Sequence, residues 1–302
     1  MNPPSFELEG IDNRVFDKAL VYYSNVRVLD WQAYLGMALL GFAHGLNNSI
    51  FTWSSYNTLI KLLISHMFFL AFTFSINNCF DIKSDEQQEK KLRKNPIAAG
   101  HMSLKEGFIL SLLLGSMGLG TTFIWFNEKP FLLYAFLLFL GFAYSVPPLR
   151  LKSIPIIDLI VHGLFFGTLL FQYGLLIACD GTFKFFPISI SIFVCSIMFE
   201  LRNHLEDINA DKLSDTITTA CWLGPIQTKI FLKILLLLHW FTLLLVLWII
   251  DYKISFIALG IITTLLILMR RDFNRCIKIT DVFTGIVYGY SALMHLIPLL
   301  AA

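Results

Sequence analysis

Two polar segments of this sequence share one spacing of amide and carboxylate side chains, N-x-x-x-D-x-x-x-D, over residues 77–85 and 203–211. In a helix, residues four apart lie on one face, so each segment would stack its polar side chains over about two turns. Mg²⁺ is typically held by one or two carboxylates, while water and phosphate oxygens take its remaining positions. The spacing therefore predicts two facing Mg²⁺-binding clusters. Their predicted ligands are Asp81, Asp85, Asp207 and Asp211.

A repeated cluster of this kind is unexpected at the ends of apolar runs. Carboxylates at positions i and i+4 repel one another, and at mid-bilayer each would cost about 2.5–3.5 kcal/mol. One such segment alone is equally well interpreted as a helix end where Asp and Asn meet water or cap the next turn. Two copies in equivalent helices favour a site that clamps a Mg²⁺-bound diphosphate from both sides. The same four aspartates are then the predicted catalytic residues.

Basic side chains follow the polar segments, where they would help to hold phosphates. Four of them lie at positions 90–94, and two more follow the prolines that end an apolar run at 148. The preference of positive residues for one side of a membrane is an alternative explanation for them. The residues predicted to bind the diphosphate are Asn77, Asn203, Lys91, Lys94, Arg150 and Lys152.

The composition indicates which elements position these residues. The chain has 302 residues, of which 56% are hydrophobic and only 15% charged, whereas soluble domains carry about 25% charged residues. A water-soluble fold so poor in charge would expose a largely apolar surface, so the sequence predicts an all-α polytopic membrane protein. A net charge of +2 gives no case for nucleic-acid binding. The five cysteines are scattered and form no C-x-x-C pair, which argues against a disulfide or zinc framework.

Apolar runs long enough to cross a bilayer as helices, about 20 residues each, predict a bundle of nine transmembrane helices. Because the polar segments end the second and the sixth of these runs, we interpret the chain as a duplicated helical unit. The predicted spans are 31–51, 58–80, 107–126, 130–148, 155–178, 185–205, 228–250, 254–270 and 280–301.

Charge placement tests this topology independently. The chain has 23 lysine and arginine residues, and all but four fall in the N-terminal arm, in the even-numbered loops or in the ends of the spans that border these loops; those four are Lys61, Lys129, Lys184 and Lys253. Positive residues concentrate on the cytoplasmic side, so the N-terminus and these loops are predicted to be cytoplasmic. The predicted organisation is a single transmembrane domain at 1–302, with a cytoplasmic arm at 1–30 and active-site loops at 81–106 and 206–227.

These segments resemble the motifs of the UbiA superfamily of intramembrane prenyltransferases, and the resemblance runs from about Arg27 to the last span. The stretches 94–103 and 144–152 also look like the family's loop after helix two and its end of helix four. The resemblance implies a nine-helix bundle with Mg²⁺ as cofactor. It implies transfer of a prenyl group from a prenyl diphosphate, through an allylic carbocation, to a lipophilic acceptor that is an aromatic quinone precursor or a lipid. It further implies a diphosphate contact for Arg27 and, through cation–π attraction, a catalytic role for Tyr144.

The sequence departs from the family pattern after the second polar segment, where Asp215 and Ile217 stand in place of a glycine and a basic residue. Two other functions stay open. One is transfer of a phosphoribosyl-type group onto a lipid phosphate in the same fold. The other is a non-enzymatic, ion-coupled membrane carrier, because repeated halves with intramembrane acids also occur in transporters. Membrane lipid is the expected surrounding, and no sequence feature indicates an obligate protein partner.

Overall fold

The computed structural model describes residues 13–46, 53–179, 187–214 and 216–300, with side chains from residue 18 to residue 296. Throughout these ranges the regular secondary structure is helical, which confirms the predicted all-α class. Asp215, one of the two departures from the family pattern, lies outside the described residues.

Six helical segments of the described chain are long and apolar enough to cross a membrane. They are α3 (Trp53–Phe80), α6 (Leu104–Trp125), the segment Ile157–Ala178, α10 (Ile188–Leu213), α12 (Pro225–Ile250) and α13 (Tyr252–Arg271). The other three predicted spans contain α2 (Gln32–Gly45), α7 (Glu128–Ser145) and α14 (Phe273–Leu300), which do not meet that criterion over the described residues. The protein is thus a multi-span helical bundle, and the count of nine stays a prediction.

The remaining elements are short. The segment Ile157–Ala178 is one continuous run of α8 (Ile157–Gly163), the π-helical turn η3 (Leu164–Thr168) and α9 (Leu169–Ala178). Such π turns are frequent at functional sites. The others are α1 (Asn13–Val26), η1 (Val28–Asp30), α4 (Ile82–Asp85), α5 (Glu89–Leu92), η2 (Leu151–Ser153) and α11 (Thr219–Leu223).

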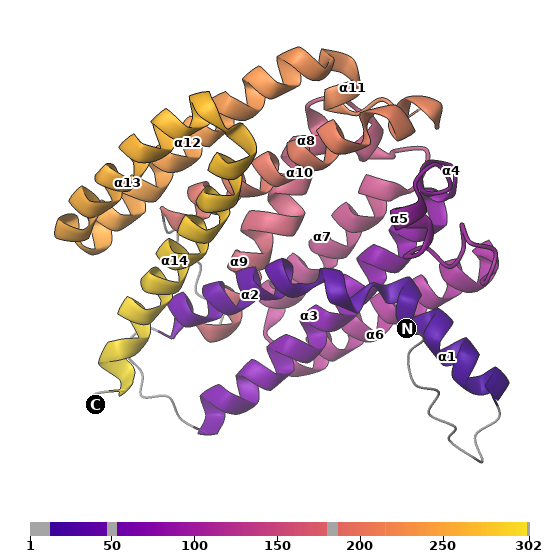
Figure 1. Cartoon of the computed structure of the whole chain (residues 1–302). Helices are drawn as coiled ribbons and strands as arrows, with labels where there is room; N and C mark the ends of the chain where they lie inside the picture. Colours follow the sequence, from indigo (N-terminus) through magenta and orange to yellow (C-terminus); the bar gives the residue numbers. More distant parts are fainter. Residues whose placement is uncertain (1–12, 47–52, 180–186, 215, 301–302) are drawn as a thin grey trace.

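The long helices pack as one bundle, shown in Figure 1, with α12, α13 and α14 on one side and α3, α6 and α7 on the other. Between these groups, α2 contacts α9 and α14, while α10 contacts α8 and α12. The largest completely buried side chains of the interior are Trp240, Tyr134 and Tyr173. The short helices α4, α5 and α11 gather at one end of the bundle, and the polar segments lie at this end.

Two glycines bring α2 and α9 into backbone contact. A Cβ atom on Gly41 would lie 1.8 Å from the carbonyl oxygen of Phe171, and a Cβ atom on Gly174 would lie 1.9 Å from that of Ala38. In membranes, helix association depends on close van der Waals packing, which small residues permit. The two glycines therefore set the spacing between α2 and α9.

The first polar segment crosses a break between helices. α3 ends at Phe80 and α4 begins at Ile82. The hydrogen-bond ladder nevertheless continues, because the Asp81 amide donates to the Asn77 carbonyl at 3.0 Å and the Asp85 amide to the Asp81 carbonyl at 2.8 Å. The three polar residues of the segment consequently stay on one side, as the spacing predicts.

The second polar segment lies entirely within α10. This helix continues to Leu213, so residues 206–213 of the predicted loop are helical. The predicted boundary at 205 is the point where the apolar run ends. Past that point, Ile208 and Ala210 are still buried and keep the last turns of the helix packed. Beyond it, α11 and the start of α12 at Pro225 occupy most of the remaining predicted loop.

The predicted N-terminal arm contains α1 and η1 in its described part. Asn25, near the end of α1, is fully buried and donates to the Ser75 hydroxyl, while the Asn78 side-chain amide donates to the Asn25 carbonyl at 3.0 Å. These bonds join the arm to α3 immediately before and within the first polar segment. Arg27 is thereby placed beside that segment.

Candidate functional site

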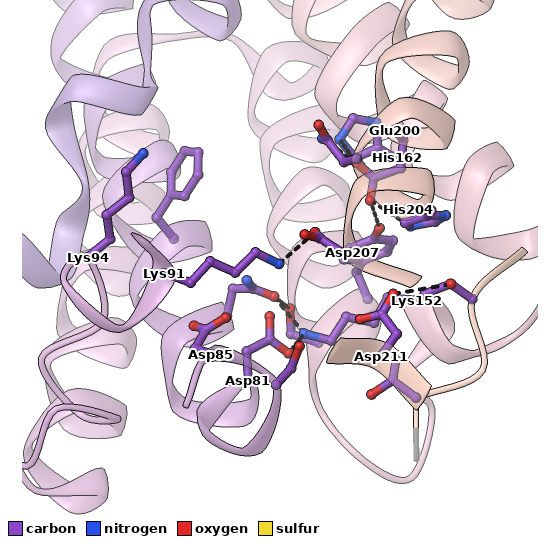
Figure 2. A pocket seen from close by; sticks show the side chains of 18 of the residues that line it. Asp81, Asp85, Lys91, Lys94, Lys152, His162, Glu200, His204, Asp207 and Asp211 are labelled. Carbon is purple, nitrogen blue, oxygen red and sulfur yellow. Dashed lines mark hydrogen bonds and ion pairs between the residues drawn. The ribbon is translucent and has the colours of Figure 1, made fainter. Parts of the chain in front are cut away.

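A cavity of about 500 Å³ lies where the first and second polar segments face one another. Figure 2 shows Asp81 and Asp85 on one wall and Asp207 and Asp211 on the other, with lysine side chains between the two walls. Every predicted site residue lines this cavity except Arg150. Residues predicted from two distant segments are therefore brought together.

Asp81 and Asn77 share one lysine. The Lys152 ammonium donates to the Asp81 carboxylate and, at 2.7 Å, to Oδ1 of Asn77, which also accepts from the Ser145 hydroxyl at 2.9 Å. Arg150, from the same loop, approaches Asp81 to 3.8 Å. Burial alone would raise the pKa of the Asp81 carboxyl, but the adjacent Lys152 outweighs it and keeps this pKa below its ordinary value. The first wall thus carries an ionised carboxylate with a buried counter-ion.

Asp85 has a neutral partner instead. Its side chain is buried and accepts a hydrogen bond at 2.8 Å from Nδ2 of Asn95, a residue held in place because its Oδ1 accepts from the Ile97 amide at 3.0 Å. Burial, followed by the charge of Asp81, raises the pKa of Asp85 above its ordinary value. A carboxylate in this state gains from a nearby cation, because opposite charge favours the ionised form.

The second wall repeats this division of partners. Asp207 accepts from Lys91 at 2.6 Å and from Gln88 at 2.9 Å, both from the segment that follows the first polar segment. Asp211 accepts from the Thr218 hydroxyl at 3.3 Å. Burial would lower the pKa of Lys91, but the Asp207 charge outweighs it and raises that pKa. Lys91 therefore stays protonated and available to an anion in the cavity.

The remaining predicted phosphate contacts stand at the edge of the cavity. Arg27 pairs with Asp30 at 2.8 Å and lies over the Phe74 ring, 5.2 Å from its centroid. Lys94 also pairs with Asp30, at 2.7 Å. The Asn203 amide donates to Glu200 at 3.2 Å. Asp30, which the sequence did not single out, thus holds two cations beside the two walls.

A second polar group in the same cavity is formed by Glu200, His162 and His204, and the sequence did not single out Glu200. The Tyr144 hydroxyl donates to Glu200 at 2.6 Å, and the two histidines lie 3.3 and 3.2 Å from its carboxylate. The signal that could have found it is a glutamate inside an apolar run, since intramembrane ionisable residues face the bundle interior and mark functional sites. His204 follows Asn203 in the second polar segment, is buried and lines the cavity.

The carboxylates and the Asn77 amide supply oxygen ligands of the kind that Mg²⁺ prefers. Within the described residues, no group of three or more acidic, histidine or cysteine side chains is arranged around a single metal position. Asp81 and Asp207 are instead neutralised by lysines. Because four carboxylates line one cavity, the donor set would suit Mg²⁺, with the four aspartates as the residues that would hold it.

Comparison with known proteins gives three kinds of match. A model of the UbiA prenyltransferase family matches residues 33–280. The probable homogentisate phytyltransferase 2 of rice (Oryza sativa subsp. japonica) chloroplasts is 31% identical over 163 residues, which cover 51% of this chain and 42% of that protein. The 2-acylphloroglucinol 4-prenyltransferase of hop (Humulus lupulus) is 27% identical over 204 residues, or 64% of this chain and 48% of that protein. The chain spans about half the length of these curated relatives.

Among solved structures, the UbiA homolog from Archaeoglobus fulgidus bound to DMAPP and Mg²⁺ superimposes with a TM-score of 0.71. The match covers 93% of this chain and 99% of that chain at 22% sequence identity. At this identity, the likeness shows that the two chains share a fold.

Proposed function

The chain belongs to the UbiA prenyltransferase family, and from this premise we propose that it is an intramembrane prenyltransferase. It would move a prenyl group from a Mg²⁺-bound prenyl diphosphate to an aromatic or lipid acceptor. The observation that carries the proposal is the single cavity in which two carboxylate walls and their lysines converge.

Within this proposal, the four aspartates would hold the metal, with Asn77 and Asn203 beside them. When bound, Mg²⁺ would neutralise the negative charge that grows on the leaving diphosphate. Lys91 and Lys152 lie against Asp207 and Asp81, so a diphosphate entering the cavity would compete with those carboxylates for both ammonium groups. Arg27 and Lys94, held on Asp30, would contact its outer oxygens, and Arg150 would act through Asp81.

An aromatic wall would suit the allylic cation that develops as the diphosphate leaves. Tyr144, Phe74 and Phe166 line the cavity between the acidic walls and the interior of the bundle. The Tyr144 ring is fixed at two points, by the bond from its hydroxyl to Glu200 and by its packing against Phe165 at 5.1 Å. An aromatic acceptor is favoured over a lipid because the curated relatives are named for homogentisate and acylphloroglucinol substrates.

For the topology, we propose nine spans, with α2, α7 and α14 crossing the membrane beside the six apolar segments. The N-terminus and the cavity end of the bundle would face the cytoplasm, since the lysine and arginine residues concentrate there. A carrier is disfavoured because carrier sites lie near the bilayer midplane between broken helices, whereas this cavity lies at one end of the bundle. Nothing in the cavity favours phosphoribosyl transfer specifically.

The test is diphosphate release from geranylgeranyl diphosphate by the purified protein, with homogentisate as the acceptor, in Mg²⁺ and in EDTA. We expect release in Mg²⁺ only, and none from Asp81→Ala or Asp207→Ala. Asp251→Asn is the matched control, because Asp251 caps α13 through the Lys253 amide and does not line the cavity. Release that survives EDTA or both alanine substitutions would contradict the proposal.

A further inference from the structure

The Glu200 carboxylate is the centre of a polar group distinct from the two acidic walls. Its Oε1 accepts from the Tyr144 hydroxyl at 2.6 Å and lies 3.2 Å from Nε2 of His204. Its Oε2 lies 3.3 Å from Nε2 of His162 and accepts from Asn203 at 3.2 Å. None of these partners is an aspartate of the polar segments. Asn203 and His204 belong to the second polar segment, but the four aspartates proposed to hold the metal make no contact with Glu200 among those given above.

Both histidines are themselves held in place. Nδ1 of His162 lies 3.1 Å from the Ser196 hydroxyl, and Nδ1 of His204 lies 3.4 Å from the Asp158 carboxylate. Asp158 is fully buried and accepts from the Thr219 amide at 2.6 Å. Asp158, His204, Glu200 and His162 thus lie in a row with neighbouring atoms within 3.4 Å, although Nδ1 of His204 makes no hydrogen bond with the described residues.

A purely structural role would be to join α7, α8 and α10 through these contacts. Apolar residues of similar volume would join them as well, because replacing buried ion pairs with packed hydrophobic side chains is often neutral or stabilising. Glu200, Tyr144 and both histidines also line the cavity rather than a sealed helix interface. In Figure 2, Glu200, His162 and His204 lie on the side of the cavity away from Lys94.

We propose that Glu200, positioned by His162 and His204, is the base that takes the proton of a phenolic acceptor. This inference rests on the proposed function and narrows its acceptor to a hydroxyl-bearing aromatic ring. To accept that proton, the Glu200 carboxylate would release one of its present donors, such as the Asn203 amide, whereas in the proposed function the four aspartates would hold the metal. The prenyl diphosphate would occupy the cavity between the acidic walls, and the phenol the part lined by Tyr144 and Glu200.

The phenol O–H bond breaks and its proton goes to Glu200. An electron pair of the ring then forms the bond from the ring carbon to C1 of the prenyl group, and the C1–O bond breaks with its electron pair leaving on the diphosphate. The hydrogen on the alkylated carbon departs as a proton to the diphosphate, while Glu200 returns its proton to the ring oxygen. Glu200 is thereby regenerated.

The test compares two acceptors in one preparation of Glu200→Gln. With homogentisate, we expect transfer to fall by about 100-fold or more, since a positioned base contributes about 10²–10⁴-fold. With a ring-fluorinated homogentisate, whose hydroxyl is more acidic, the loss should shrink by about tenfold or more, because less of the proton transfer depends on the base. The ratio between acceptors does not depend on how much of the variant is folded.

Matched measurements separate a base from a structural contact. Binding of geranylgeranyl diphosphate with Mg²⁺ should be unchanged in Glu200→Gln, and His162→Asn should lower kcat with an unchanged KM for that substrate. Asp281→Asn removes a carboxylate that pairs α14 with Arg202 of α10 at 2.9 Å outside the cavity. This control should lower prenyl transfer to both acceptors by the same factor, if it lowers transfer at all.

The outcomes are distinguishable. If the unmodified protein releases no diphosphate in Mg²⁺, both the proposed function and this inference are overturned. If the unmodified protein transfers the prenyl group and Glu200→Gln transfers it equally well, only the inference fails. An equal loss with both acceptors would likewise overturn it and assign Glu200 a structural role.

Discussion

The two acidic walls have the same residues at the same spacing, yet they are built differently. The first crosses the break at Asp81 between α3 and α4, and its lysine, Lys152, comes from a distant loop and has a side chain that is only 9% exposed. The second stays on the unbroken α10, and its lysine, Lys91, has a side chain that is 31% exposed. Spacing thus determines which residues face the cavity, whereas the partners of those residues determine how rigidly each wall is held. We expect the first wall to be the more rigid one.

One feature is common to both walls. The first aspartate of each segment pairs with a lysine, and the second aspartate accepts from a neutral donor, Asn95 for Asp85 and Thr218 for Asp211. In the described part of the chain, therefore, neither Asp85 nor Asp211 forms an ion pair with a lysine. They should be the ligands that respond most directly to a metal.

Substituting the second aspartates tests whether the walls are equivalent. Asp85→Asn and Asp211→Asn should each weaken the apparent Mg²⁺ affinity by more than about 100-fold, because losing an outer-shell partner alone costs about 10–100-fold. The measurement is Mg²⁺ titration of diphosphate release. A large loss for one and none for the other would show that a single wall holds the metal.

Removing the two lysines should affect stability unequally. Lys152→Met removes a buried cation and leaves the partly exposed Asp81 carboxylate with Arg150 at 3.8 Å, which should cost about 1–3 kcal/mol. Lys91→Met breaks a partly exposed pair, worth about 0–1 kcal/mol. Thermal unfolding in detergent would show the difference, with Lys83→Met on the exposed side of α4 as the control. Equal shifts in Tm would mean that the two walls do not differ in rigidity.

Substituting the neutral donors Asn95 and Thr218 should give a smaller difference between the two walls. Asn95→Ala removes the partner of Asp85 and should lower the apparent Mg²⁺ affinity by about 10–100-fold, as expected of an outer-shell contact. Thr218→Val removes a longer bond to Asp211, 3.3 Å against 2.8 Å, so its effect should fall at or below the lower end of that range. The reverse order in the same titration would contradict the view that the first wall is the more rigid one.

The amides of the two segments should show the smallest difference. Asn77 accepts from Lys152 and Ser145 in the interior, and removing one partner of a buried polar group costs about 1–3 kcal/mol. Asn203 is exposed, and surface substitutions usually stay within about 0.5 kcal/mol. The Tm of Asn77→Ala and the Tm of Asn203→Ala would measure the two losses of stability. A larger loss for Asn203 would indicate that its bond to Glu200 matters more than its exposure suggests.

The sequence was sufficient for the helical class and for the residues of both walls, because period and spacing are local properties. It could not give their partners, since the contacts of Lys152 with Asp81 and of Lys91 with Asp207 depend on how distant loops fold over the cavity. Arg150 shows the limit within one loop, because it shares the sequence neighbourhood of Lys152 but does not line the cavity. The repeated spacing could not identify Glu200, because that residue does not share it.

The end of α10 shows a related limit. Hydropathy detects where apolar residues stop, and it placed the end of the span at 205, whereas the helix continues to Leu213. The last turns carry Asp207 and Asp211 on the cavity side and buried apolar residues on another. A helix that leaves the apolar region without ending is invisible to a window of mean hydropathy.

The close contacts between α2 and α9 at Gly41 and Gly174 have a consequence for inherited variation. A Cβ atom added at either position would lie less than 2 Å from a facing carbonyl oxygen. Both positions therefore exclude even alanine, the smallest substitution for glycine. α9 continues the segment that carries His162 and Phe166 into the cavity. A missense variant at either glycine should therefore abolish activity from a position remote from the chemistry, by parting two helices rather than by altering any reacting group.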